Sequence, residues 1–254
     1  MQIDLNGRRA LVTGAGSGIG AAIARALGAS GADVAVHYAN SKTGADDVVD
    51  ELTGLGRRAV AIGGDLTDPA QASATVAAAV AHLGGLDILV TNAGHLVGRA
   101  TVAEMSDAHW AQVMAVNVSS TFFVTRAAVP HLTDSPAGRV VLMSSLAAEN
   151  GGGAGSVAYA AAKAAIVGFG RGLAKELAGA GVTVNALAPG FIGDTAFHNT
   201  FTPAQAQQGI VSGIPLQRAG TVDDVAGVSV FLASGLSSYV TGQVIDINGG
   251  MNFR

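Results

Sequence analysis

The sequence predicts an α/β fold in which helices cover both faces of a parallel sheet. Two observations lead to this prediction. Short β-branched runs alternate with alanine-rich helical stretches along the 254 residues, and no low-complexity linker or internal repeat divides the chain. Strands that alternate with helices of this length form βαβ crossovers, which place the strands parallel and the helices on both faces. We therefore expect a single domain over residues 1–254.

The elements follow one another in regular order. The expected strands span residues 9–13, 34–37, 59–62, 87–91, 139–144, 182–187 and 244–247. The expected helices span residues 18–30, 42–54, 69–83, 107–132, 156–180 and 222–234. One helix start is marked by Asp68-Pro69, because an N-cap Asp followed by Pro at the first helical position favours helix initiation.

The segment from Gly190 to Gly220 breaks this alternation. It lacks a strong strand signal but carries apolar residues, among them Phe191, Phe197 and Phe201. Loops of this length in compact domains are usually functional lids or disordered segments, and the apolar content favours a lid. We therefore expect a substrate lid at about 190–220.

Composition restricts the partners. Charged residues make up 13% of the chain, the formal net charge is -4, and there is no run of Lys or Arg, which argues against nucleic acid. The absence of cysteine excludes disulfides and thiolate nucleophiles. The nearly uncharged residues 69–86 are too weakly apolar for a membrane span, and the start does not resemble a secretory signal. We expect a cytoplasmic protein, no membrane partner, and surface buried between subunits.

A glycine-rich turn lies between the first expected strand and the following helix. In residues 11–27, "LVTGAGSGIGAAIARAL", Gly14, Gly16, Gly18 and Gly20 alternate with other residues. Glycines permit a tight turn and let the backbone approach a pyrophosphate at the positive end of a helix. Four alternating glycines exceed the needs of an ordinary turn, so we expect a nucleotide phosphate here.

Tyr159 and Lys163 lie four residues apart in "AYAAAKAAI", whose alanines favour a helix. This spacing places both side chains on one helical face. Alone, the pair fits a packed tyrosine beside a lysine that reaches solvent. Next to a nucleotide loop it fits acid–base chemistry, because a cation one turn away favours ionisation of a phenol whose ordinary pKa is about 10.

These motifs occur in order with "TNAG" at residues 91–94, Asn117, Ser145 and Pro189-Gly190. The chain resembles a classical short-chain dehydrogenase/reductase over essentially its whole length, and it is similar to β-ketoacyl-carrier-protein reductases and related small-molecule reductases. The resemblance implies a single-domain Rossmann fold, with a doubly wound seven-stranded parallel sheet, that binds NAD(H) or NADP(H).

The resemblance implies a catalytic set of Asn117, Ser145, Tyr159 and Lys163. Ser145 is expected to hold the substrate oxygen, and Tyr159 to exchange its proton. Lys163 is expected to support Tyr159 and to hold the nicotinamide ribose. Asn117 is expected to hold a water beside Lys163, although an asparagine that satisfies helix backbone fits the sequence equally well.

The resemblance also implies a cofactor-binding set at the carboxyl ends of the strands. Its members are Gly14, Ser17, Gly18, Ile19, Gly20, Tyr38, Asn40, Ser41, Asp65, Leu66, Asn92, Ala93, Gly94, Tyr159, Lys163, Pro189, Gly190 and Ile192. Asp65 is expected at the adenine amino group, or else as a loop carboxylate near a helix start. Ile192 is expected to contact the carboxamide through its backbone. Asp194 stands where the family often has threonine.

The end of the second expected strand bears on the choice of cofactor. NAD-specific folds usually hold an acidic residue there, which repels a 2′-phosphate. Here no carboxylate lies between Asp33 and Asp46, and Lys42 adds a positive charge. We therefore expect NADP(H), with NAD(H) as the alternative, although Ser17 stands where NADP-dependent relatives often carry arginine.

The leading hypothesis is an NAD(P)-dependent oxidoreductase that transfers a hydride between the cofactor and a small-molecule secondary alcohol or ketone. Tyr159 is the general acid/base, no metal is expected from the spacing of the six histidines, and the resemblance implies a homotetramer. One alternative is a 3-oxoacyl-(acyl-carrier-protein) reductase. The acidic chain and the lack of Lys and Arg at residues 131–138 and 176–182 argue against an acidic carrier. Epimerisation or dehydration by the same Tyr/Lys pair, and a non-catalytic NAD(P) sensor or scaffold, are further alternatives.

Overall fold

Seven strands form one parallel sheet in the computed structural model, which describes residues 3–195, 200–201 and 203–253. The strands are β1 (Arg9–Val12), β2 (Asp33–Tyr38), β3 (Ala59–Gly63), β4 (Ile88–Thr91), β5 (Arg139–Met143), β6 (Thr183–Pro189) and β7 (Val244–Ile247). Their order is β3-β2-β1-β4-β5-β6-β7, and every neighbouring pair is parallel. The predicted doubly wound sheet is confirmed, with its change of direction between β1 and β4.

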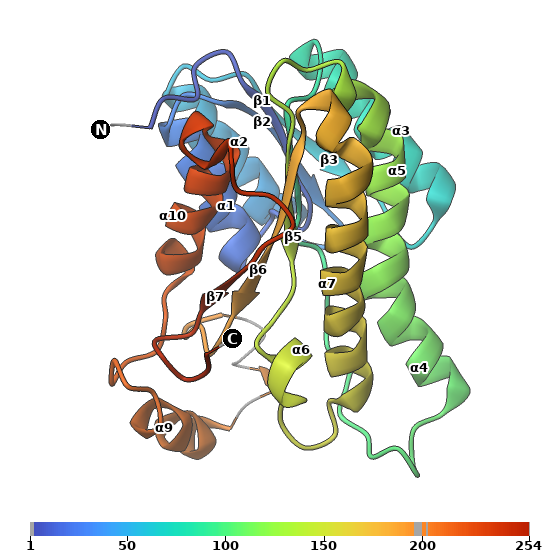
Figure 1. The fold of residues 1–254 in the computed structure, drawn as a ribbon, viewed down its shortest axis with the longest axis vertical. Coiled ribbons are helices and arrows are strands. Elements are labelled where there is room, and N and C mark those ends of the chain that lie inside the picture. Colours follow the sequence, from blue (N-terminus) through green and yellow to red (C-terminus); the bar gives the residue numbers. More distant parts are fainter. Residues whose placement is uncertain (1–2, 196–199, 202, 254) are drawn as a thin grey trace.

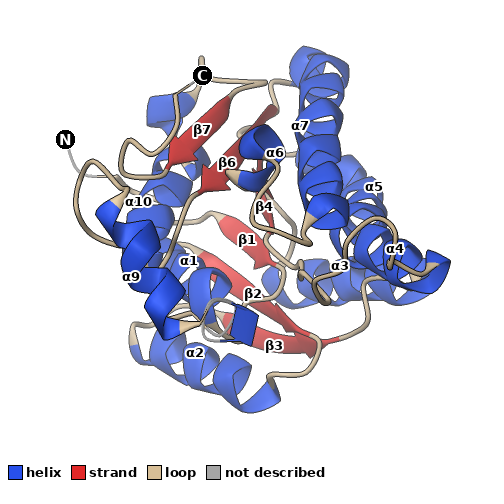
Figure 2. Cartoon of the chain, turned by 90° about the horizontal axis from the view of Figure 1, so that it is seen from below, coloured by secondary structure: helices blue, strands red, loops and turns tan. Residues whose placement is uncertain are grey.

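Helices cover both faces of this sheet (Figures 1 and 2). One face carries α1 (Gly18–Ala29), α2 (Lys42–Gly54) and α10 (Val222–Ala233), and the other carries α3 (Pro69–Leu83), α5 (Ser120–Thr133) and α7 (Val157–Leu177). The remaining helices are α4 (Asp107–Met114), α6 (Ala147–Asn150) and α9 (Ala204–Ser212), with short turns η1 (Ala115–Ser119), η2 (Ala178–Ala180) and η3 (Gly235–Ser237). None of the helices in the described part of the chain has the length and apolarity to cross a membrane.

The strands are apolar because both of their faces are buried. Successive residues of β1 enter different clusters: Val12 packs with α1, α2 and α10, whereas Leu11 packs with α3, α5 and α7. All five residues of β5 are buried. Burial of this kind contributes about 1.5–3 kcal/mol per large aliphatic side chain. Because the strands are parallel, their carboxyl ends meet at one edge, and the loops at that edge carry the polar motifs.

The expected start of α3 is confirmed in detail. The Asp68 carboxylate accepts hydrogen bonds from the amides of Ala70 and Gln71, at 2.7 and 3.3 Å, with Pro69 as the first helical residue. These bonds satisfy two of the amides that an α-helix leaves without an internal partner.

The structure differs from the predicted secondary structure in three places. The helix expected over residues 107–132 is interrupted by the π-helical turn η1, which divides it into α4 and α5. Helix α9, within the segment expected as a lid, and the short helix α6 were not expected. That segment also forms a β-bridge between Ile192 and Gly220, and its role as a lid stays a prediction. Phe197 and His198 of the expected lid lie outside the described residues.

Candidate active site

Ser145 and Tyr159 meet at the carboxyl edge of the sheet. Ser145 follows β5, and Tyr159 lies in the first turn of α7, where its phenol is hydrogen-bonded to the Ser145 side chain. Lys163 lies one turn further along α7, with its Nζ 5.6 Å from the centroid of the Tyr159 ring. The structure therefore brings Ser145, from the end of β5, to the Tyr159/Lys163 pair of α7.

The two adjacent serines have different environments. The Ser144 hydroxyl is buried and donates to the backbone carbonyl of Lys163 at 2.9 Å, so it ties α7 to the end of β5. The Ser145 hydroxyl is half-buried and accepts from the amide of Ala147 at 3.1 Å. Only the second serine reaches Tyr159 in this way, which supports the assignment of Ser145 over Ser144.

Burial dominates the ionisation of the Tyr159/Lys163 pair. It raises the pKa of Tyr159 to about 12, against a lowering by the hydrogen bond with Ser145. It also lowers the pKa of Lys163 to about 8. In the protein alone, burial therefore decides the direction of the Tyr159 shift, and the expectation that the Lys163 charge favours the ionised phenol stays a prediction. At pH 7 the phenol keeps its proton, as a proton donor must.

Gly94 is the point where Asn117 and Lys163 converge. A Cβ added at Gly94 would lie 2.7 Å from Asn117 Oδ1 and 3.0 Å from Lys163 Nζ, so only glycine fits without displacing them. Lys163 Nζ itself donates to the Met143 carbonyl at the end of β5, at 2.9 Å. Two of the four residues predicted as catalytic, Asn117 and Lys163, are thus packed against the end of the 91–94 motif.

The Asn117 side chain is fully buried and holds the loop after β4. Its Nδ2 donates to the carbonyls of His95 and Val113, at 2.8 and 2.9 Å, and its Oδ1 accepts from the His95 amide at 3.2 Å. The bond to the Val113 carbonyl agrees with the interpretation that Asn117 satisfies helix backbone, and the bonds with His95 fix the site loop. The water beside Lys163 stays a prediction. Asn117 lies in the π-helical turn, a feature that is frequent at functional sites.

The glycine loop is packed so closely against neighbouring backbone that side chains at Gly16 and Gly20 would clash with it. A Cβ at Gly16 would lie 2.5 Å from the Ser41 carbonyl oxygen, and a Cβ at Gly20 would overlap the Gly14 carbonyl. Ser17 is the N-cap of α1 but makes no side-chain capping bond. The first amides of α1 therefore have no cap from Ser17, which fits a phosphate of the expected dinucleotide.

The 91–94 motif stabilises this loop from the neighbouring strand. The side-chain amide of Asn92 donates to the carbonyls of Thr13 and Gly14, at 3.0 and 3.1 Å. The Ala93 amide donates to Thr13 Oγ1 at 3.0 Å. Asn92 and Ala93 therefore act on the glycine loop through hydrogen bonds, and the sequence reading did not identify Thr13 as their partner.

The residues after β2 divide into two groups. Tyr38 packs over Gly63 of β3, whose added Cβ would lie 2.9 Å from the phenol oxygen. Asn40 and Ser41 are exposed, and the Ser41 backbone lies against the glycine loop. Lys42 is exposed and forms an ion pair with Asp46 at 2.6 Å, so its ammonium already has an anionic partner.

The loop after β3 contains Asp65 and Leu66. The Asp65 carboxylate is exposed and accepts from the amide and hydroxyl of Thr67, at 2.9 and 2.7 Å, whereas Leu66 is buried. The loop-carboxylate reading of Asp65 describes these contacts. Its second carboxylate oxygen has no bond to Thr67, so an adenine contact stays a prediction.

The segment predicted as a lid, at about 190–220, begins at the end of β6. The Pro189 carbonyl accepts from the Leu146 amide at 2.9 Å, and the Gly190 amide donates to the Ile247 carbonyl at 2.9 Å. The Ile192 carbonyl accepts from the Thr195 hydroxyl at 3.1 Å. Pro189 therefore joins the lid to the Ser145 loop.

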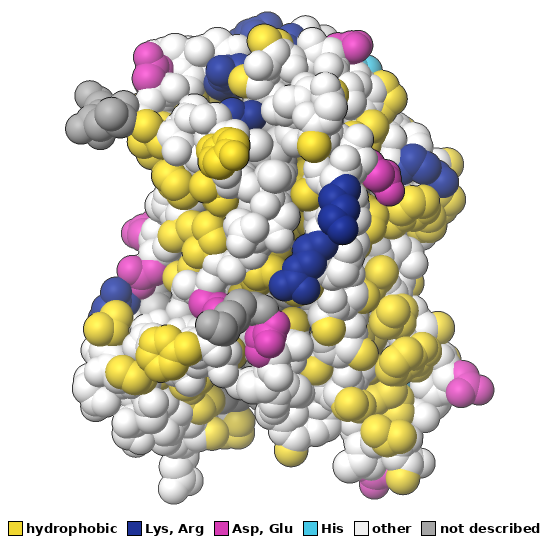
Figure 3. All heavy atoms as spheres, in the orientation of Figure 1, with side chains coloured by type: hydrophobic (Ala, Val, Ile, Leu, Met, Phe, Trp, Pro, Cys, Tyr) yellow, Lys and Arg dark blue, Asp and Glu magenta, His cyan; other side chains and the backbone are white. Residues whose placement is uncertain are grey.

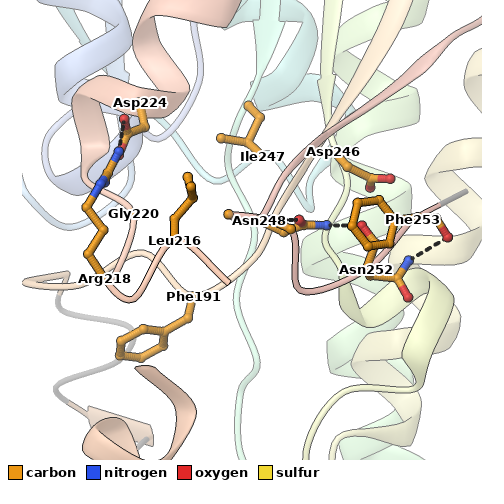
Figure 4. Close-up of a pocket in the computed structure, with 12 residues that line it drawn as sticks. Phe191, Leu216, Arg218, Gly220, Asp224, Asp246, Ile247, Asn248, Asn252 and Phe253 are labelled. Carbon is orange, nitrogen blue, oxygen red and sulfur yellow. Dashed lines mark hydrogen bonds and ion pairs between the residues drawn. The ribbon is translucent and has the colours of Figure 1, made fainter. Parts of the chain in front are cut away.

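A cavity of about 480 Å³ lies between the lid and the C-terminal tail (Figure 4). Its walls include Phe191, Leu216, Asn248 and Phe253, and one side is closed by the ion pair of Arg218 with Asp224. None of the four predicted catalytic residues lines it. Among the described residues, no cluster of three His, Cys, Asp or Glu side chains has the arrangement of a metal site.

His37 is a site residue that sequence reasoning missed. Its ring contacts the backbone of Gly14 and of Gly64, so it touches both loops of the predicted cofactor site. The available signal was a polar residue near the end of an apolar strand, in "DVAVHY".

Comparison with known proteins decides the family. The family model described as enoyl-(acyl carrier protein) reductase matches residues 14–252. Individual relatives match 97% to 98% of this chain. The protein belongs to the short-chain dehydrogenase/reductase family. It is accordingly an NAD(P)-dependent oxidoreductase of that family, as the motifs predicted.

Three of its relatives illustrate the match. Versicolorin reductase of Emericella nidulans is 41% identical over 256 residues, which cover 97% of this chain and 96% of that protein. The 3-oxoacyl-(acyl-carrier-protein) reductase of Escherichia coli is 37% identical over 249 residues, or 98% and 99% of the two chains. The crystal structure of a short-chain dehydrogenase from Burkholderia cenocepacia in complex with NADP has a TM-score of 0.91 at 38% identity, covering 98% of this chain and 99% of that one.

Proposed function

We propose that the protein reduces the carbonyl group of a small molecule to a secondary alcohol, with NADP(H) as cofactor and Tyr159 as general acid. The observation that carries this proposal is the hydrogen-bonded Ser145–Tyr159 pair, with buried Lys163 one turn away, at the sheet edge that holds the glycine loop. The same residues run the reverse reaction when Tyr159 accepts the proton.

The proposed chemistry divides between the protein and the cofactor. When bound, the nicotinamide supplies the hydride that adds to the carbonyl carbon. Ser145 and Tyr159 donate hydrogen bonds to the carbonyl oxygen, where negative charge develops, and Tyr159 then gives that oxygen its proton. Lys163, which is held by the Met143 carbonyl, supplies the positive charge beside the phenol, and Asn117 keeps the adjacent loop in place.

The loops at the carboxyl ends of the strands hold the cofactor in this proposal. The α1 N-terminus suits the pyrophosphate, and Ser41 and Asn40 lie where a ribose or 2′-phosphate would follow. The bound NADP of the Burkholderia cenocepacia relative supports NADP(H) here. The lack of a carboxylate between Asp33 and Asp46 supports it further, because no charge at the end of β2 repels the phosphate.

We propose that residues 1–254 act as one cofactor-binding domain with the lid at about 190–220, and that the chain assembles into a homotetramer. Exposed apolar side chains support two separate contacts. Figure 3 shows apolar side chains gathered over α4 and α5, where Trp110 and Phe122 are 45% and 42% exposed. Tyr239 and Phe253, near the C-terminus, are also exposed. Two self-complementary faces give 222 symmetry.

Light scattering tests the assembly. We expect a tetramer at micromolar concentration, and a dimer for each of the variants Phe122→Asp and Tyr239→Asp, because each variant would disrupt one contact. A monomeric wild-type protein would contradict the proposal.

A carrier-bound β-ketoacyl group is the second candidate substrate. Arg171 and Lys175 are exposed on α7, one turn apart, and Figure 3 shows a run of Lys and Arg side chains in the middle of that face. This basic strip would attract an acidic carrier. It lies outside residues 131–138 and 176–182, the two segments without Lys or Arg that argued against such a carrier in the sequence. The identity of 37% to the Escherichia coli reductase also supports this candidate.

The deciding experiment is a comparison of kcat/KM. NADPH oxidation is followed with cyclic ketones, β-keto esters and steroid ketones, and with a carrier-bound β-ketoacyl substrate. We expect turnover of free ketones that Tyr159→Phe abolishes. A large preference for the carrier-bound form, which Arg171→Glu then reduces, would select the second candidate. Binding of NADPH without turnover of any carbonyl would overturn both.

A further inference from the structure

His37 is a buried polar residue near the end of an apolar strand. It is the fifth residue of β2, and only 1% of its surface is exposed. Both ring nitrogens nevertheless have partners. Nδ1 accepts from the Gly14 amide at 3.1 Å, and Nε2 lies 3.0 Å from the Gly64 carbonyl oxygen. Gly14 belongs to the glycine loop, and Gly64 precedes Asp65 in the loop after β3.

These partners determine which ring nitrogen carries the proton. A backbone amide can only donate, so Nδ1 must present its lone pair to Gly14. A carbonyl can only accept, so Nε2 must carry the hydrogen that points to Gly64. The ring is therefore neutral. A second proton would sit on Nδ1 and face the Gly14 amide, which would break this bond.

The backbone of His37 adds a second bond to the same loop. Its carbonyl accepts from the Ala15 amide at 2.7 Å. His37 thus binds two successive loop amides, while Asn92 binds the carbonyls of Thr13 and Gly14 on the other side. With its first residues held this way, the loop leads directly into the α1 N-terminus, which Ser17 does not cap.

We propose that His37 is a positioning residue for cofactor binding: its neutral imidazole holds the glycine loop and the loop that carries Asp65 at a fixed spacing. The proposal rests on the proposed role of these loops in binding the cofactor. Loss of the imidazole, or its protonation, lowers cofactor affinity without removing any group that touches the cofactor. Preorganised loops avoid an ordering cost when the ligand binds.

The surroundings of the ring contain one charged group that acts on it. Burial lowers the pKa of His37 below the ordinary value of about 6.5, and the hydrogen bond with the Gly64 backbone and the charge of Asp65 oppose this with smaller effects. Across the sheet, His37 is paired with Ile62 of β3. The buried side chains of α1, α2 and α3 are uncharged. Any pH dependence from this position therefore belongs to His37 with Asp65.

The first test is spectroscopic. Long-range ¹H–¹⁵N NMR spectra of the histidine rings at pH 7.5 distinguish the two neutral tautomers and the protonated form, and His37→Asn identifies the His37 signals by their loss. We expect the tautomer with hydrogen on Nε2. A ring with hydrogen on Nδ1, or a protonated ring, overturns the proposal even if the variants bind poorly.

The second test measures the Kd for NADPH and NADH by fluorescence titration. Asparagine at position 37 offers an oxygen to the Gly14 amide but does not titrate, whereas leucine removes both bonds. We expect affinity to fall about threefold for His37→Asn and about tenfold for His37→Leu, in line with one and two lost hydrogen bonds. His82→Asn, at an exposed site on α3, is the control.

The pH profile completes the test. The wild-type Kd should rise as the pH falls through the pKa that NMR gives for His37, and the ratio of variant to wild-type Kd should shrink there. Comparing proteins at the same pH cancels ionisation of the cofactor. Equal Kd values in wild type and both variants overturn the proposal, and if His37→Leu does not fold, His37→Asn and the tautomer decide. A wild-type protein that binds neither cofactor instead refutes the proposed function.

Discussion

The two parts of the predicted cofactor site differ in how they are held. Around Tyr159, the polar groups are buried or half-buried and bonded to one another or to backbone: Ser145 to Tyr159, Lys163 to the Met143 carbonyl, and Asn117 to the loop after β4. At the end of β2, Asn40, Ser41 and Lys42 are exposed. A buried network tolerates little change, whereas exposed groups at a loop can vary at small cost to stability. We therefore expect the first region to set the chemistry and the second to set the choice of cofactor.

The largest expected effect in the buried region is that of Tyr159→Phe. Removing the proposed general acid should lower kcat by about 1,000-fold or more, while the Kd for NADPH stays within about twofold. Steady-state kinetics and fluorescence titration measure the two quantities. Tyr239→Phe, at a fully exposed position, should change neither, and a Tyr159→Phe protein with near wild-type kcat would show that the acid is another group.

The next effect is that of Gly94→Ala. The added methyl group would meet Asn117 Oδ1 and Lys163 Nζ at 2.7 and 3.0 Å, so one of them must move. We expect about a 100-fold loss of kcat/KM, since small displacements of catalytic groups are costly. Gly172→Ala on α7 is the matched control, because no atom lies within 4 Å of its added Cβ. If both variants keep full activity, the network is less rigid than its contacts indicate.

Lys163→Met tests the cost of the buried charge. Burial lowers the pKa of Lys163 to about 8, so the charged form is disfavoured in the folded state. The substitution should therefore raise the free energy of unfolding at pH 7 by on the order of 2 kcal/mol while it removes activity. The protonated Lys163 lowers the free energy of unfolding most below about pH 8, where the folded and the unfolded protein both carry it. This destabilisation falls as the pH rises from about 8 to 10.5, because the folded protein loses the proton first.

Urea unfolding at pH 7 and at pH 10 measures this gain. It should be larger at pH 7, and Lys175→Met, at an exposed site, should show no such difference. A loss of stability at pH 7 would mean that the bond to the Met143 carbonyl outweighs the desolvation of the ammonium.

The smallest effects belong to the exposed region. Lys42 pairs with Asp46, so Asp46→Asn should free the ammonium and lower the KM for NADPH about threefold, with the KM for NADH unchanged. Lys42→Asp should raise the KM for NADPH more than that for NADH. Both effects should shrink at high salt, because the groups are exposed. A wild-type kcat/KM that is higher with NADH than with NADPH would show that the predicted preference for NADP(H) is wrong.

Much of this architecture could be predicted from the sequence because the signals are local. The glycine loop, the N-cap at Asp68 and the strand–helix alternation each follow from short-range rules. The π-helical turn could not be predicted, since a helix that widens for five residues keeps its apolar pattern on both sides. The Ala- and Gln-rich α9 was missed because it has neither charge nor strong apolar periodicity.

The electrostatics at Tyr159 depend on tertiary burial, which spacing cannot reveal. Four-residue spacing identified the Tyr159/Lys163 pair, but the direction of the pKa shift came from desolvation. In the same way, the role of His37 depends on two glycines that lie 23 and 27 residues away in the chain. Bonds between distant loops of this kind leave no periodic trace in a sequence.

The π-helical turn has a consequence for how this chain can change in length. The wide turn is closed by the Ser120 amide, which donates to the Ala115 carbonyl. The hydroxyls of Ser120 and Thr121 donate to the carbonyls of Val116 and Asn117, at 2.7 and 2.9 Å. A π-helical turn holds one residue more than an α-helical turn. Deleting one residue here would therefore restore an ordinary α-helix in which α4 and α5 keep their buried faces, whereas the same deletion in a regular helix rotates one end by about 100° against the other. We expect the backbone at Asn117 to change and its bonds with His95 to be lost. The segment is therefore a place where a single-codon deletion would disturb the site while leaving a continuous, packed helix.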